Sequence, residues 1–194
     1  MSYPQGWDTF CQWRQENPEI PLPETLNLSE INRFAARFRL AQSYEGINLK
    51  DYPELAIEAY GSLFGVFLAY SALEQLYKAV GKPNKIIADE WAINEPKIAN
   101  KLRRSKRLLI FIHDKLYPSK LKNKVIQFQD KENNNILVIA QAMRHLVAHG
   151  IMTIHAGRIS PKTTINFCNS VKQCVNDKSQ ICFTEYVLNN IIDE

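Results

Sequence analysis

The stretch PELAIEAYGSLFGVFLAYSALEQLYKAV, residues 53 to 80, decides the fold class because it carries the longest helical pattern of the chain. A proline opens it, and Glu54 lies near the positive end of the expected helix. Its uncharged run, residues 59–73, is shorter than the about 20 apolar residues that cross a bilayer. The stretch therefore predicts a buried central helix, in which Gly61 and Gly65 allow another backbone to come close.

Helical spacing of apolar residues continues on both sides of this stretch. We expect helices over 29–46, where Ser29 serves as the cap, over 95–117, over 163–176 and over 179–192. Asn134 or Asn135 can cap another helix, which contains the stretch that begins at Gln141. Residues 120–135 are polar and turn-rich and predict a loop with at most a short strand or helix, and residues 151–164 predict either a short extended piece or a tight connection. No segment alternates as a strand does, so the expected fold is an all-α bundle of about five to seven helices.

The ends of the chain suggest its organisation. Four prolines within the first 28 residues exclude one long helix there, so residues 1–50 are interpreted as a proline-rich arm with an accessory helix, and residues 51–194 as the bundle domain. The N-terminus lacks the basic start and apolar stretch of a secretory signal, which favours the cytoplasm and reduced cysteines. The four cysteines show no metal-site spacing, so no metal or other cofactor is expected.

Composition excludes two broad classes. Hydrophobic residues make up 45% of the 194 residues and charged residues 23%, values typical of a folded soluble protein and not of a disordered or a membrane protein. The net charge is only +4, but residues 97–124 contain ten lysines and arginines against one acid. That segment can attract a polyanion, although a basic helix is just as often an ordinary solvated face.

The stretch QAMRHLVAHGIM, residues 141 to 152, places polar groups inside an apolar run. At about 100° per residue, Gln141, Arg144, His145 and His149 share one arc of the helix, and apolar residues cover most of the remainder. An arginine and a histidine at the edges of this arc fit a bound phosphate, because the first offers a fork of donors and the second exchanges a proton near neutral pH. In the structural alternative, Arg144 pairs with an acid from another helix and His149 only occupies the negative helix end.

RHLVAHG, residues 144 to 150, resembles the signature of HEPN domains, in which an arginine, commonly followed by a polar residue, is separated by four to six residues from a histidine on a late helix of an all-α bundle. Arg144, His145 and His149 match these three places. Glu74 and Lys78 are similar to an E-x-x-x-K pattern of some HEPN families, and a plain ion pair on one helix explains them equally well. The resemblance covers about residues 50–192.

The resemblance implies a homodimer that acts as a metal-independent endoribonuclease, often as a toxin with an antitoxin or in defence and stress. Arg144 would then stabilise the phosphate, His149 would transfer a proton, and His145 would assist while the 2′-hydroxyl attacks and leaves a 2′,3′-cyclic phosphate. Additional RNA contacts are expected from four residues: Gln141, Arg103, Arg104 and Arg107. The alternative is a non-catalytic helical adaptor that binds an anion, RNA or a regulatory partner protein.

Overall fold

A computed structural model describes residues 3–81, 87–117 and 119–192, and within them the fold is all-α, as expected. The described residues contain no strand and one isolated bridge, between Asn94 and Asn135. More helical segments are present than the expected five to seven. They are α1 (Trp7–Glu16), α2 (Leu28–Ser43), α3 (Glu54–Ala79), α4 (Ile87–Glu90), α5 (Pro96–Arg103), α6 (Lys106–Lys115), α7 (Ser119–Gln129), α8 (Ile136–Ala148), the 3₁₀ turn η1 (Ala156–Arg158), α9 (Pro161–Phe183), the π-helical turn η2 (Thr184–Leu188) and α10 (Asn189–Ile192).

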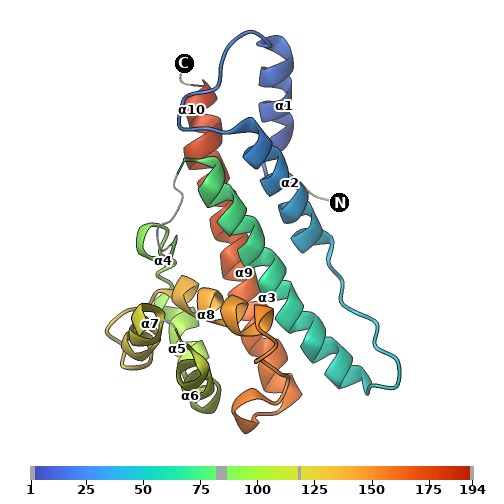
Figure 1. Ribbon diagram of the computed structural model, residues 1–194, viewed down its shortest axis with the longest axis vertical. Coiled ribbons are helices and arrows are strands. Elements are labelled where there is room, and N and C mark those ends of the chain that lie inside the picture. Colours follow the sequence, from blue (N-terminus) through green and yellow to red (C-terminus); the bar gives the residue numbers. More distant parts are fainter. Residues whose placement is uncertain (1–2, 82–86, 118, 193–194) are drawn as a thin grey trace.

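The central helix is α3, as its sequence predicts. It packs lengthwise against α2 and α9, and α8 crosses its lower half with α5, α6 and α7 gathered on one side (Figure 1). Gly61 allows the expected backbone approach, because a Cβ there would lie 3.4 Å from the Cα of Gly46. Gly65 instead makes room for the aliphatic part of the Lys172 side chain. A Cβ at position 65 would lie 3.2 Å from Cδ of Lys172.

Helix α3 is also the helix in the described part of the chain that is long and apolar enough to cross a membrane by length and composition. Half of its most apolar window is buried inside the bundle, and the core helices of soluble proteins meet the same criterion. Its Ala69, Leu73 and Leu76 have no exposed surface. The bundle itself therefore accounts for the apolar character of this helix.

The first fifty residues share the core with the C-terminal helix. Phe10 of α1 and Phe34 of α2 both contact Phe183 of α9, with the rings of Phe34 and Phe183 5.6 Å apart. The cap of α2 lies two residues earlier than expected, because the side chain of Asn27, and not of Ser29, accepts the hydrogen bond from the backbone N–H of Glu30. The proline-rich arm is thus folded onto the bundle by aromatic packing.

Two helical predictions were wrong in their bounds. The expected helix over 95–117 is broken between α5 and α6 at Arg104 and Ser105, where the backbone tightens into turns with hydrogen bonds to Lys101 and Leu102. At the C-terminus the two expected helices are one, since α9 runs from Pro161 to Phe183 and continues through the wider turn η2 into α10. Polar residues around position 177 do not interrupt α9, because its opposite side stays buried on α3.

The segment 120–135 holds more helix than the expected loop with at most a short helix, since most of it is α7. Leu121, Val125 and Phe128 recur at helical spacing and are buried, although four of the five residues between them are polar. The turn that follows α7 leads to Asn135, which caps α8 as predicted by accepting from the N–H of Leu137. Asn135 also accepts from the N–H of Ile93, so the start of α8 is tied to the segment before α5.

Candidate functional site

Helix α8 has a dry side and a wet side, as the helical wheel predicts. Eight of its thirteen residues are buried, while Gln141, Arg144 and His145 are only partly exposed along one arc. The helix ends at Ala148, and Gly150 follows with a φ of 67°. The N–H of Ile151 reaches back to the carbonyl of Leu146 at 2.9 Å, which is the hydrogen bond of a glycine-terminated helix.

The wet side of α8 forms one wall of a pocket of about 440 Å³. Helix α3 contributes Tyr70 and Glu74 to this pocket, and the first turn of α7 contributes Ser119, Lys120 and Leu121. Helix α8 contributes the remaining lining residues, which are Gln141, Arg144 and His145. The pocket therefore gathers one arginine, one lysine, one histidine and one glutamate from three helices, and we refer to it as the α8 pocket.

Arg144 is held at this pocket by Glu74. Its Nη2 donates to Oε2 of Glu74 at 3.0 Å, and both side chains keep about a third of their surface exposed (35% and 27%). Glu74 thus pairs with Arg144 across two helices rather than with Lys78 on its own helix. Nε of Arg144 and Oε1 of Gln141 are buried without a hydrogen-bond partner in the described part of the chain, which costs free energy.

The two histidines of the motif differ in position. The ring of His145 lines the α8 pocket, whereas His149 follows the last helical residue, is exposed, and is not among the lining residues. The ring centroids are 4.5 Å apart, so the imidazoles touch. Burial, followed by the neighbouring His149 and Arg144, lowers the pKa of His145 and keeps its ring neutral at pH 7. His145 therefore has the geometry and the protonation state of a proton acceptor.

Tyr70 closes the inner end of the α8 pocket. It is 2% exposed, and burial together with the charge of Glu74 raises the pKa of its hydroxyl, which therefore stays protonated near neutral pH. Neither Tyr70 nor the α7 residues Ser119 and Lys120 were expected at the site. The sequence offers no signal for them, because they come from segments far from the motif.

The three arginines expected to bind RNA do not meet at the α8 pocket. Arg103 is 8% exposed, and its guanidinium donates to the carbonyl oxygens of Phe128 and Asn133 at 2.6 and 2.5 Å. Its donors are used within the protein, so its position corrects the expectation that it contacts substrate. Arg104 is exposed at the end of α5, and Arg107 is exposed on α6 beside η1.

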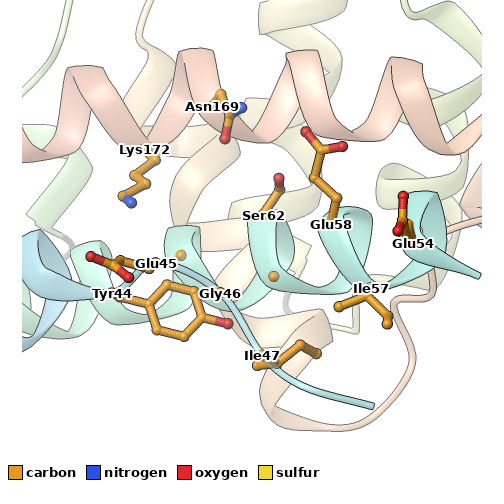
Figure 2. A pocket seen from close by; sticks show the side chains of 12 residues that line it. Tyr44, Glu45, Gly46, Ile47, Glu54, Ile57, Glu58, Ser62, Asn169 and Lys172 are labelled. Atoms are coloured by element: carbon orange, nitrogen blue, oxygen red, sulfur yellow. The ribbon is translucent and has the colours of Figure 1, made fainter. Parts of the chain in front are cut away.

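A further pocket of about 460 Å³ lies between α3, α9 and the segment before α3. Figure 2 shows the carboxylates of Glu45, Glu54 and Glu58 around it, with Lys172 as the one cationic side chain in its lining. Three negative charges against one positive charge repel a polyanion. Charge thus favours the α8 pocket over this one as a site for a phosphate-bearing ligand.

Comparison with known proteins assigns no family to this chain. No protein-family model, no curated protein and no solved structure matches the chain. Within the described ranges, no three histidine, cysteine, aspartate or glutamate side chains are grouped so that they could hold a metal ion. The resemblance to HEPN domains stays a prediction that rests on Arg144, His145 and His149.

Proposed function

We propose that the α8 pocket binds the phosphate backbone of RNA and cleaves it without a metal ion. The observation that carries this proposal is the convergence of Arg144, His145 and Glu74 in one open pocket, with His149 in ring contact with His145. Glu74 orients the guanidinium through Nη2 of Arg144, and the side chain of Arg144 keeps 35% of its surface exposed at the pocket. These are the groups that a phosphoryl transfer requires: a cation for the phosphate and two proton carriers.

The proposed reaction uses the nucleophile that RNA itself supplies. Neutral His145 accepts the proton of the 2′-hydroxyl while the 2′-oxygen forms a bond to phosphorus. Arg144 stabilises the negative charge that accumulates on the phosphorane oxygens. His149 donates a proton to the 5′-oxygen as the bond between phosphorus and that oxygen breaks. The products are a 2′,3′-cyclic phosphate and a free 5′-hydroxyl.

This assignment exchanges the histidine roles that the motif suggests. The resemblance to the HEPN motif implies that His149 transfers the proton and that His145 assists. The geometry favours His145 as the base, because it lines the pocket and its pKa is lowered, and leaves the exposed His149 as the acid. Lys120 and Gln141, at the edge of the same pocket, would contact the flanking phosphate or ribose.

The wider setting is part of the proposal. Ala148, His149 and Gly150 are all exposed at the end of α8, so a second copy of the chain has access to this end and would complete a homodimeric cleft. A ribonuclease of this kind would act in the cytoplasm as a toxin or defence component, restrained by an antitoxin or another partner protein.

A second candidate is a non-catalytic site that binds an anion. The pairing of Arg144 with Glu74 favours it, because an arginine held by an acid on another helix also satisfies the structural interpretation of the motif. The position of His149 outside the pocket favours it too. In that protein the α8 pocket would retain RNA or a phosphorylated partner without cutting it.

The first test compares RNA with DNA of the same sequence in excess EDTA. We expect the protein to shorten the RNA and to leave the DNA intact, because only RNA carries the 2′-hydroxyl. Arg144→Gln should abolish cleavage, whereas Arg33→Gln should retain it, since Arg33 pairs with Glu30 at 2.7 Å on α2, a helix that contributes no residue to the pocket lining. Intact RNA contradicts the ribonuclease, and Arg144-dependent binding of that intact RNA supports the second candidate.

A further inference from the structure

A separate cationic pocket of about 460 Å³ lies between α6 and the turn η1. Arg107, Ile110 and Asp114 line it from α6, and His155 and Arg158 line it from η1 and the residue before it. All five of these side chains are exposed. The pocket is therefore a surface hollow whose two walls both carry an arginine.

The backbone of η1 is pressed tightly onto α6. Gly157 has a φ of 69°, and a Cβ at this position would lie 2.4 Å from the carbonyl oxygen of Arg107, so only glycine fits. Arg158 follows with a φ of 55°, a left-handed conformation that costs a residue with a side chain about 1 kcal/mol. This strained turn places the charge of Arg158 on the pocket that Arg107 also lines.

The acid in this pocket, Asp114, forms no ion pair with either arginine. Asp114 Oδ1 lies 2.8 Å from Nδ1 of His113 on its own helix, so its carboxylate is engaged there. Arg107 and Arg158 form no ion pair in the described part of the chain. Arg107 and Arg158 therefore place two positive charges on one hollow, and the strained backbone at Arg158 helps to hold them there. An anion bound between the two arginines would stabilise this arrangement.

The floor of the hollow is apolar. Ile110 is 53% exposed, and Phe111 beside it is partly exposed. A ligand that combines negative charge with flat apolar surface covers both features at once. A nucleotide unit of single-stranded RNA has this composition, because its phosphate meets guanidinium groups and its base stacks on side chains such as phenylalanine and arginine.

We propose that the α6–η1 pocket is a second RNA-binding site that holds a nucleotide of the strand cut at the α8 pocket. This inference rests on the proposed function and adds to it the path of the RNA. His149, which touches the His145 ring of the α8 pocket, and His155, which lines the α6–η1 pocket, are six residues apart, so their Cα atoms lie within about 20 Å of each other. The strand would leave the end of α8 and run onto α6 and η1, where Asp114 is the one acidic side chain in the lining of the pocket.

The test measures RNA binding separately from cleavage. A His145→Ala protein keeps a fluorescent single-stranded RNA intact, and anisotropy then gives its Kd across a range of salt concentrations. Adding Arg107→Gln and Arg158→Gln should weaken binding about tenfold or more near 0.1 M salt and lower the slope of log K against log salt by about 1.4, which corresponds to two lost phosphate contacts. The matched control, Arg33→Gln with Arg37→Gln, removes the same charge from α2 and should change the slope little.

Each outcome decides the inference. An equal loss in both double variants, or no RNA binding at all, overturns the α6–η1 site. Competition by poly-glutamate as strong as that by RNA also overturns it, because the hollow would then bind acidic peptide. If the His145→Ala protein binds RNA through Arg107 and Arg158 while the wild-type protein cuts no RNA, the ribonuclease proposal fails and this site stands.

Discussion

Replacing His145 by alanine is expected to lower the rate of RNA cleavage by about 10²- to 10⁴-fold, the contribution of a positioned general base. The reason is its place in the α8 pocket, in the same lining as Arg144, with a ring that is neutral at pH 7. Single-turnover cleavage of a labelled RNA measures the effect. The melting temperature of the variant should stay close to that of the wild type, because His145 is partly exposed.

The pH profile separates a general base from a structural histidine. A base acts in its deprotonated form, so cleavage falls as the pH drops through its pKa, and the lowered pKa of His145 places this limb below pH 6.5. The charge of His149 is one cause of that lowering. His149→Ala should therefore move the limb upward toward pH 6.5 while reducing the rate. An unchanged rate in His145→Ala, or a limb that moves downward in His149→Ala, contradicts the assignment.

Replacing Arg103 by methionine is expected to lower the free energy of unfolding by about 3 kcal/mol, because buried hydrogen bonds from a charged donor are lost and their acceptors stay buried. The guanidinium bonds to Phe128 and Asn133 and, at 2.9 Å each, to the side-chain oxygens of Asn100 and Asn134. It also lies 4.6 Å from the ring centroid of Phe128. These bonds join α5 to the turn before α8, so Arg103 also positions the helix that carries the site.

Urea unfolding of this variant and of Arg104→Met measures the difference. Arg104 is the next residue, carries the same charge and is exposed, so its replacement should change stability by less than about 0.5 kcal/mol. For a chain of this size the loss at Arg103 corresponds to a fall in melting temperature of about 6–12 °C. Equal stability of the two variants would mean that Arg103 does not support the turn before α8.

The parts of the fold that could be predicted are those in which local pattern and tertiary packing agree. Helix α3 and the wet and dry sides of α8 follow from dense apolar spacing, and Asn135 caps α8 as expected. Helix α7 was missed because its buried residues, Leu121, Val125 and Phe128, are too few among polar neighbours to outweigh them in sequence. These three residues stabilise the helix only when they pack against the rest of the core.

The candidate site could be predicted only where its residues lie close together in the sequence. The motif predicts that Gln141, Arg144, His145 and His149 share an arc. The structure places the first three on one pocket and leaves His149 outside its lining. Glu74 lies 70 residues before Arg144, so no spacing rule could join them, and only the crossing of α3 and α8 does. The role of Arg103 was hidden for a related reason, because its acceptors are carbonyl oxygens at the end of α7 and in the turn that follows it, 25 and 30 residues away.

The central claim is that the α8 pocket cuts RNA by activating the 2′-hydroxyl of the RNA as the nucleophile. The most direct measurement is the mass of the upstream RNA fragment after digestion in EDTA by the wild-type protein, with His145→Ala as the control. The account predicts a 2′,3′-cyclic phosphate on that fragment, a free 5′-hydroxyl on the downstream fragment, and neither product from the control. A 3′-hydroxyl on the upstream fragment, or the same products from His145→Ala, would contradict it.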